Sequence, residues 1–280
     1  MGKRGTRRLE RVEIKGNPYN HLMEYSMNVT KEKIIRFLYD MRVAKTSQIA
    51  RVMEQSKDYT RKNLKDLYIN RLVYRDFPPI QKEKYGSAEG VYFLDNQGAF
   101  FLAADSGIEK KEVNWDPRDN VVSLGAVKHS LDITEIRTCM EEYKSDLSVD
   151  RFIGERRIGR INYIYQGEEI NFNPDAYIIL KKKLEGKIAR ISFFLEYDRG
   201  TESFKTFLRK IRDYEKFYRS EKIKEMYGTH PGVLIITNHK LRTDRIKKLI
   251  MKNKVEDIKY YFATLDEDYK EDPFCFLANN

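Results

Sequence analysis

The sequence has 280 residues, with 53 Lys and Arg against 43 Asp and Glu and a formal net charge of +10. Its length allows two domains that each bury a core, and its apolar content of 41% excludes a disordered tail. No apolar run approaches membrane-spanning length, and the start of the chain has no signal-peptide core. We therefore expect a soluble cytoplasmic protein without a membrane partner.

The excess of basic residues favours a polyanionic partner, most commonly a nucleic acid, over an ordinary solvated surface. Cys139 and Cys275 have no spacing that indicates a zinc site or a disulfide framework, which fits a reducing compartment.

Residues 1–25 are predicted to form a flexible basic arm, because glycines and Pro18 interrupt any continuous helix. Such an arm either lies along phosphates and becomes ordered on binding or serves only as a solubilising leader. Its basic residues are Lys3, Arg4, Arg7, Arg8, Arg11 and Lys15.

Three helices are predicted next. One begins with Thr30 as its N-cap, a short one begins at Thr46 or Ser47, and the third spans about 58–70. This order, with a tight turn between the second and third helices, indicates a helix-turn-helix.

Two strand-like runs at 72–77 and 90–94 follow, separated by a polar loop with Lys82 and Lys84. Together, residues 26–105 are predicted to be a winged helix with a basic wing.

In a winged helix the third helix enters the major groove of DNA. Leu64 and Leu67 define its buried side, and Arg61 or Lys62 would contact base edges or phosphates. The alternative is a winged helix used for protein contacts, against which the basic surface argues. The residues expected to face outward are Lys57, Tyr59, Thr60, Arg61, Lys62 and Lys65.

A linker is predicted over 106–120, and a second domain over 121–280 that begins with a long buried helix over 121–147. Glu135 continues a row of apolar residues on that helix. Its carboxylate either belongs to a metal site or marks the place where the row reaches solvent.

Three carboxylates lie at the ends of two predicted strands in the second domain. Asp175 opens the apolar run 176–180, while Glu196 and Asp198 close the run 188–195. Residues two apart on a strand share a face, and neighbouring strands would bring Asp175 to the other two. Converging carboxylates repel unless a hard cation lies among them, so the pattern indicates a magnesium site. The alternative is a solvated rim of the sheet.

The helix predicted after Gly200 and Thr201, up to about Met226, has a basic line beside its buried face. Such a line either tracks a phosphate backbone or merely extends along the protein surface. Its members are Lys205, Arg209, Arg212, Lys216 and Arg219. Residues 150–158, 161–165 and 170–180 are also strand-like, and a strand, a helix and a last strand follow the basic helix. The predicted order of helix, three strands, helix, strand, helix and strand indicates an α/β sandwich of the restriction-endonuclease type.

The Asp at one strand start and the Glu near the next strand end resemble the PD-(D/E)xK nuclease core. Asp198 stands where that family has Lys, with Arg199 next to it. The amino-acid sequence at 174–176 and 195–202 more closely resembles the replication-relaxation family of plasmids and other mobile elements. In that family such a domain follows an N-terminal winged helix, and the resemblance covers about 30–265.

This resemblance implies a protein that binds double-stranded DNA in replication or DNA relaxation, with other replication or mobilisation proteins as further partners. The alternative is an endonuclease that uses Mg²⁺ or Mn²⁺, held by Asp175 and Glu196 with Glu135 or Asp198. Lys205 would then substitute for the usual lysine. A tyrosine relaxase is excluded because the four histidines are scattered along the chain.

Overall fold

The computed structural model describes residues 10–77, 89–220, 222–252 and 258–278. The chain divides into two compact units, unit 1 up to Leu131 and unit 2 from Asp132. The division falls inside helix α6 (Leu124–Glu142), and not in the linker expected at 106–120, which belongs to unit 1. Each unit is described by itself below.

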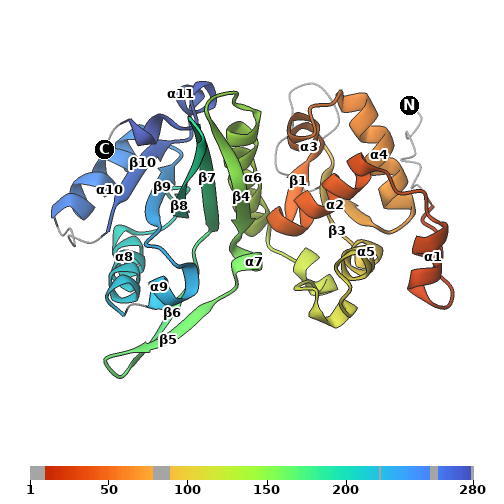
Figure 1. Ribbon diagram of the computed structural model, residues 1–280, viewed down its shortest axis with the longest axis horizontal. Helices are drawn as coiled ribbons and strands as arrows, with labels where there is room; N and C mark the ends of the chain where they lie inside the picture. Colours follow the sequence, from red (N-terminus) through yellow and green to blue (C-terminus); the bar gives the residue numbers. More distant parts are fainter. Residues whose placement is uncertain (1–9, 78–88, 221, 253–257, 279–280) are drawn as a thin grey trace, which may run out of the picture. The chain divides into compact units, whose positions relative to one another are not determined.

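Unit 1 combines helices with a small antiparallel sheet in the strand order β1-β3-β2 (Figure 1). Asn28, and not Thr30, caps α2, because its side chain accepts a hydrogen bond from the Lys31 N–H at 2.9 Å. In chain order the elements are α1 (Pro18–Glu24), α2 (Val29–Met41), β1 (Val43–Lys45), α3 (Thr46–Val52), α4 (Lys57–Ile69), β2 (Val73–Asp76), β3 (Val91–Leu94), α5 (Asn96–Ser106) and the 3₁₀ turns η1 (Lys110–Glu112) and η2 (Pro117–Asn120).

From residue 10 onward the N-terminal segment is anchored by contacts, which corrects the expectation of a flexible arm for residues 10–25. The Arg11 guanidinium donates to the Tyr68 carbonyl at 3.0 Å and lies 4.7 Å from the centroid of the Tyr68 ring. Within α1, Tyr19 packs edge-on against Phe100 of α5, with 5.2 Å between ring centroids. The four basic residues expected at positions 3 to 8 lie outside the described residues.

Unit 2 is built on a five-stranded sheet in the order β10-β9-β8-β7-β4. β7 pairs antiparallel with β4 and β8, whereas β8, β9 and β10 run parallel. The predicted succession of helix, three strands, helix, strand, helix and strand is present, with a hairpin and short helices added. After α6 the elements are β4 (Leu147–Gly154), α7 (Glu155–Ile158), β5 (Ile161–Tyr165), β6 (Glu168–Phe172), β7 (Ala176–Leu184), β8 (Lys187–Asp198), α8 (Phe204–Arg219), α9 (Lys222–Tyr227), β9 (Gly232–Thr237), α10 (Lys240–Lys252), β10 (Tyr260–Thr264), α11 (Glu267–Glu271) and the 3₁₀ turn η3 (Cys275–Leu277).

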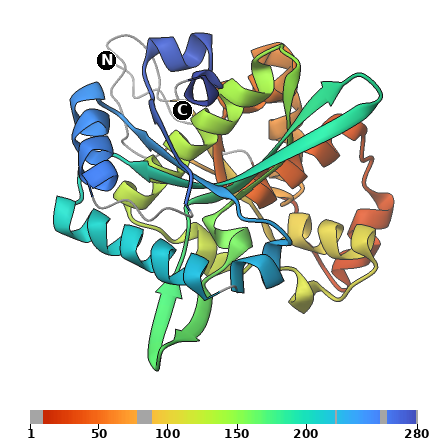
Figure 2. The same ribbon diagram turned by 60° about the vertical axis from the view of Figure 1, so that its left-hand side comes forward.

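The added hairpin, β5 and β6, forms a two-stranded sheet of its own (Figure 2). The apolar run expected to be continuous over 170–180 is therefore split between β6 and β7. Alternate hairpin residues face α8, where Phe172 lies 4.4 Å from Tyr214 and Tyr163 lies 5.3 Å from Phe217, measured between ring centroids. This packing stabilises the hairpin, because an isolated two-stranded hairpin is only marginally stable in water.

Helices α8 and α10 lie on one side of the sheet and α6 on the other (Figure 1). A hydrophobic core of unit 2 lies under α8 and α10 and includes Phe194, Tyr214, Phe217, Val233 and Ile246. Within the described ranges, the structure contains no helix with the length and apolar character needed to span a bilayer.

Gly98 in α5 provides a test of packing in unit 1. A Cβ there would lie 2.4 Å from the Leu72 carbonyl oxygen, which is backbone and moves little. We expect Gly98→Ala to lower the free energy of unfolding by about 1–3 kcal/mol. Urea unfolding followed by circular dichroism measures the change. Gly125→Ala in α6 is the matched control, because the nearest atom to its Cβ would be 3.9 Å away, and it should be neutral or stabilising by up to about 1 kcal/mol. Equal stability of Gly98→Ala and wild type would contradict the close approach.

Candidate functional site

The register of β7 and β8 places Asp175 beside Glu196. Ala176 pairs with Leu195, and the Asp175 N–H donates to the Leu195 carbonyl at 3.0 Å. The Asp175 Oδ2 atom in turn accepts from the Tyr197 N–H at 2.7 Å. The predicted pairing of the two strands is confirmed, and both carboxylates are almost fully buried, at 6% exposure for Asp175 and 2% for Glu196.

Helix α8 provides two partners for Glu196. The Tyr214 hydroxyl donates to Oε1 at 2.8 Å, and the Lys210 ammonium lies 3.3 Å from Oε2. Lys210 and Tyr214 are four residues apart, so they share one face of the helix. The chain reaches this helix through a turn in which Gly200 has φ of +77°, and the Ser203 side chain caps the helix by accepting from the Thr206 N–H at 3.2 Å.

Asp198 has partners of its own. Its Oδ1 accepts from the Gly200 N–H at 2.7 Å, and its Oδ2 lies 2.7 Å from a guanidinium nitrogen of Arg242 on α10. Arg242 also donates to the Glu202 carbonyl at 2.7 Å and lies 4.1 Å above the centroid of the Phe204 ring. Asp198 therefore joins β8, the start of α8 and α10.

The electrostatics of the site follow from burial. The pKa of Glu196 is raised to about 7, chiefly by desolvation and also by the charge of Asp175, against the opposing effects of Lys210 and Tyr214. The negative charge of Glu196 raises the pKa of Lys210, which keeps the ammonium charged at neutral pH. The result is a buried carboxylate pair with one cation beside it and one carboxylate that titrates near neutrality.

A divalent cation such as Mg²⁺ needs oxygen ligands that converge on one point. Across the part of the chain that the structure describes, no group of three or more His, Cys, Asp or Glu side chains is arranged to hold a metal ion. The expected site of Asp175, Glu196 and Asp198 is not such a group, and metal binding by these residues stays a prediction. The Asp175 and Glu196 pair still fits Mg²⁺, which is commonly held by one or two carboxylates together with water and phosphate oxygens.

The structure places Lys205 on α8, Glu135 on α6 and Arg199 directly after β8. Lys205 is exposed on α8, and the lysine that reaches Glu196 is Lys210. Glu135 is half-buried on α6, with the Cys139 Sγ atom 3.8 Å from its Oε1. Arg199 pairs with Asp132 at 2.9 Å. Sequence spacing could have indicated Lys210 through its position four residues before the buried Tyr214, but nothing in the sequence indicated Arg242.

In unit 1, the outward face of α4 is basic, as expected, with one correction. Thr60 is fully buried, at 0% exposure, and its hydroxyl donates to the Ser56 carbonyl at 3.0 Å. Tyr59 is 46% exposed. Lys82 and Lys84 of the expected wing lie outside the described residues. The exposed basic residues of α4 are Lys57, Arg61, Lys62 and Lys65.

The expected basic line on α8 lies on the side of the helix opposite Phe207, Tyr214 and Phe217, which are buried. Lys216 is half-buried and pairs with Glu168 of β6 at 2.7 Å. The exposed members of the line are Lys205, Arg209, Arg212 and Arg219.

Comparison with known proteins gives one match. A family model described as replication-relaxation matches residues 35–233, which include α4 of unit 1 and the Asp175, Glu196 and Lys210 cluster of unit 2. Neither a curated protein nor a solved structure matches the chain significantly.

The ionisation of Glu196 can be tested directly. We expect Asp175→Asn to lower the pKa of Glu196, because it removes a neighbouring negative charge, and Lys210→Met to raise it. Carbon-13 NMR of the glutamate carboxyls across the pH range measures both changes. Asp198→Asn is the control, because Asp198 pairs with Arg242, and it should leave the pKa of Glu196 nearly unchanged.

The same group links stability to pH. The pKa of Glu196 is higher in the folded chain than its ordinary value of 4.5, so its contribution to stability is full below about pH 4.5 and is lost as the pH rises through about 7. A Glu196 carboxyl that titrates below its ordinary range would contradict the buried pair.

Proposed function

The chain belongs to the replication-relaxation family, and on that premise we propose that it binds double-stranded DNA through a winged helix in unit 1. Membership in the family supports a role in the replication or relaxation of plasmid or other mobile-element DNA.

The order of elements supports the winged helix. Helices α2, α3 and α4 are followed by the strands β2 and β3, and β1 completes the antiparallel sheet. Four residues, from Met53 to Ser56, connect α3 to α4. In this arrangement α4 is the helix that enters the major groove.

The observation that carries the proposal is the division of α4 into two faces. Thr60, Asn63, Leu64 and Leu67 are buried and fix the inner side. The outer side presents Lys57, Arg61, Lys62 and Lys65 together with Tyr59. Lysine and arginine on an exposed helix contact phosphates and base edges, and tyrosine donates to phosphates. Asp58 is paired with Arg61 at 2.8 Å and is the only acid on the first two turns of this fully described helix.

We expect the double variant Arg61→Ala and Lys62→Ala to bind duplex DNA roughly tenfold more weakly than wild type. The slope of log affinity against log salt concentration should become shallower by the equivalent of about two phosphate contacts. Fluorescence anisotropy with a labelled duplex at several salt concentrations measures both effects.

The matched control is the double variant Lys33→Ala and Lys111→Ala, which removes the same charge from exposed positions of unit 1 outside α4. It should bind as wild type does. Wild-type affinity in the α4 variant would show that α4 does not dock on DNA and would favour a winged helix that contacts proteins.

A second function is favoured by the contact between Lys210 and Glu196. The parallel and antiparallel pairings of unit 2 and its Asp, Glu and Lys cluster support a PD-(D/E)xK-like nuclease in which the lysine comes from α8. Asp175 and Glu196 would hold Mg²⁺ or Mn²⁺, which when bound lowers the pKa of a water molecule that attacks a phosphodiester. Lys210 would contribute positive charge beside the scissile phosphate, and Tyr214 would orient the Glu196 carboxylate.

If unit 2 is a nuclease, the wild-type protein should nick supercoiled plasmid in the presence of Mg²⁺ or Mn²⁺. Glu196→Gln and Lys210→Met should each lower the nicking rate by about 100-fold or more. Lys205→Met is the control, since Lys205 is exposed on α8, and it should retain activity.

Calorimetric titration of wild type and Asp175→Asn with Mg²⁺ adds a readout that does not depend on turnover. Wild-type protein that neither binds metal nor nicks plasmid would exclude the nuclease and leave the DNA-binding function.

A further inference from the structure

We propose that α8 and α10 of unit 2 together form a second DNA-binding surface, which grips the sugar-phosphate backbone between two parallel lines of cations. The inference rests on DNA being the partner under the proposed function, but its residues lie in the other unit. It can therefore fail or hold independently of α4.

The first line is the outer side of α8. Its members recur at intervals of four and three residues, which keeps them on one side of a helix. The buried side of α8 carries Phe207, Ile211, Tyr214 and Phe217 into the core, so the cations point away from the sheet. The structure describes every residue of α8, and none of its large apolar side chains is exposed among these cations.

The second line lies on α10 and was not predicted. Arg245, Lys248 and Lys252 are exposed and follow the same spacing of three and four residues. Thr243, Ile246 and Ile250 are buried on the opposite side of the helix. Because the buried sides of α8 and α10 both face the sheet, the two cation lines emerge on the same side of unit 2.

Contacts at two places show that the helices lie side by side and run in the same direction. Near their N-termini, Arg242 of α10 lies above the Phe204 ring of α8. Further along, Ile250 of α10 meets Leu208 and Ile211 of α8 at a pocket of about 230 Å³. Packed helices lie about 8–10 Å apart, and α8 with its 16 residues is about 24 Å long.

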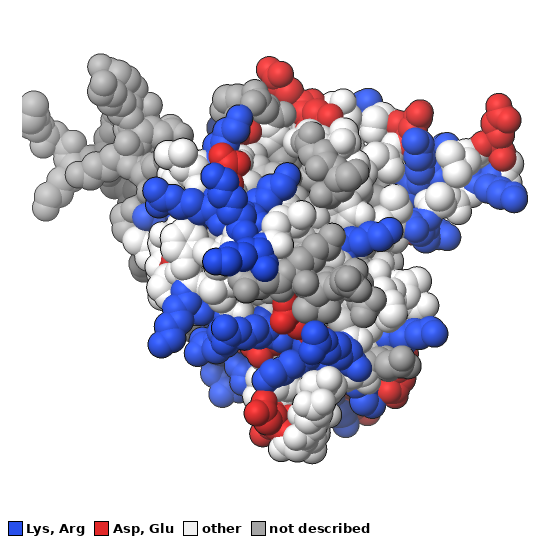
Figure 3. All heavy atoms as spheres, turned by 90° about the vertical axis from the view of Figure 1, so that its left-hand side faces the viewer, with Lys and Arg blue, Asp and Glu red and all other residues white. Residues whose placement is uncertain are grey.

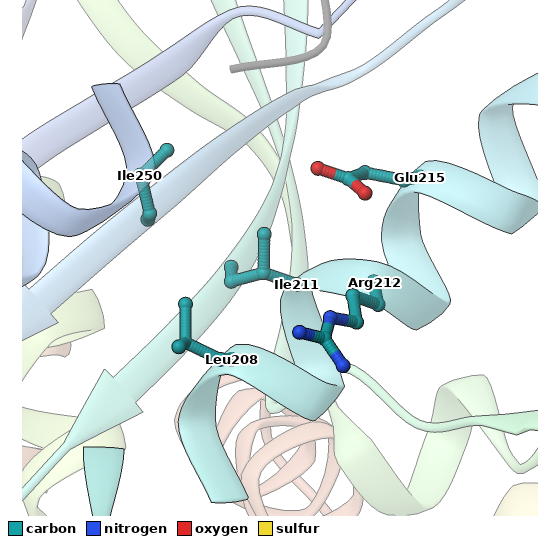
Figure 4. Close-up of a pocket in the computed structure, with 5 residues that line it drawn as sticks. All are labelled: Leu208, Ile211, Arg212, Glu215 and Ile250. Atoms are coloured by element: carbon teal, nitrogen blue, oxygen red, sulfur yellow. The ribbon is translucent and has the colours of Figure 1, made fainter. Parts of the chain in front are cut away.

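Figure 3 shows the resulting surface, on which Lys and Arg side chains gather in two bands over this face of unit 2. Arg212, which belongs to the first line, and Glu215 lie on the α8 side of the pocket, and Ile250 of α10 lies on its other side (Figure 4). Glu215 is half-buried at the pocket, whereas the cations of the two lines are exposed on either side of it.

The geometry identifies a phosphate backbone as the occupant. One DNA strand presents a phosphate for about every 3.4 Å of axis, so a straight line of cations along a helix meets several phosphates in succession. Contacts to phosphates carry no sequence information, so a surface of this kind binds without sequence preference. A lipid surface is the competing anion, and it would need apolar side chains among the cations. Of the two helices, α10 has exposed large apolar side chains, Leu241 and Met251, and α8 has none. This distribution favours DNA over a lipid surface.

The experiment uses the full chain and the triple variant Arg209→Ala, Arg245→Ala and Lys248→Ala, which takes cations from both lines at exposed helical positions. We expect at least tenfold weaker binding to a duplex of random sequence. Between about 50 and 200 mM salt, the slope of log affinity against log salt concentration should be shallower by the equivalent of about three phosphate contacts. Circular dichroism and thermal unfolding confirm that the variant is folded.

The matched control removes three exposed cations from the β7–β8 hairpin of the same unit, Lys182→Ala, Lys183→Ala and Lys187→Ala. It should bind within about twofold of wild type. The inference is overturned if the triple variant binds DNA as wild type does, or if the control loses as much affinity. It is also overturned if the triple variant loses only its binding to phosphatidylserine vesicles.

The α4 variant separates the two proposals. If loss of Arg61 and Lys62 has no effect while the triple variant binds weakly, the docking of unit 1 fails and the surface of unit 2 stands. If the α4 variant binds weakly and the triple variant binds normally, only the surface of unit 2 fails.

Discussion

The sheet of unit 2 buries three carboxylates, and their negative charges must be compensated by nearby partners. The packing of helices on this sheet depends on that requirement. Asp175, Glu196 and Asp198 are 6%, 2% and 4% exposed. A buried charge left without its partner costs about 3–5 kcal/mol, which is a large part of the stability of a domain. Asp175 accepts from a backbone N–H of β8, whereas the side chains that compensate Glu196 and Asp198 come from α8 and α10, so these two helices must pack close to the end of β8.

Compensation differs between the carboxylates, and so does what each can do. Asp198 is held by Arg242 and by the backbone of its own turn, so it serves the junction of β8, α8 and α10. Glu196 is held by a lysine and a tyrosine and still has a raised pKa. A carboxyl that titrates near neutrality beside a charged ammonium is typical of a functional site, although structural ion pairs produce it as well. Asp198 is thus fixed by an ion pair and a backbone hydrogen bond, whereas Glu196 lies beside Asp175 and keeps a raised pKa.

Helix α8 links this site to the surface of the molecule. Its inner side supplies Lys210 and Tyr214 to Glu196, and its outer side presents the exposed cations of the basic line. A single amphipathic helix can do both because 3.6 residues per turn separate the two sets by about half a turn. Helix α4 of unit 1 follows the same rule, with buried leucines on one side and exposed lysines and arginines on the other.

Much of this could be predicted from the sequence, because it depends on local pattern. The periodicity of apolar residues predicted α4, α6, α8 and the strands β7 and β8, and the acids at the strand ends predicted which edge of the sheet carries the site. The basic line on α8 was also visible, since helical spacing alone puts its members together.

Only the tertiary structure decided which partners those residues have. Lys205 and Lys210 are both on α8, but Lys210 lies on the flank that faces β8, and the sequence does not say how the helix is rotated on the sheet. Arg242 is 44 residues from Asp198 in the sequence, and it reaches that carboxylate only because β9 places α10 beside α8. Pairings of this kind depend on packing between distant segments, and one-dimensional spacing contains no record of them.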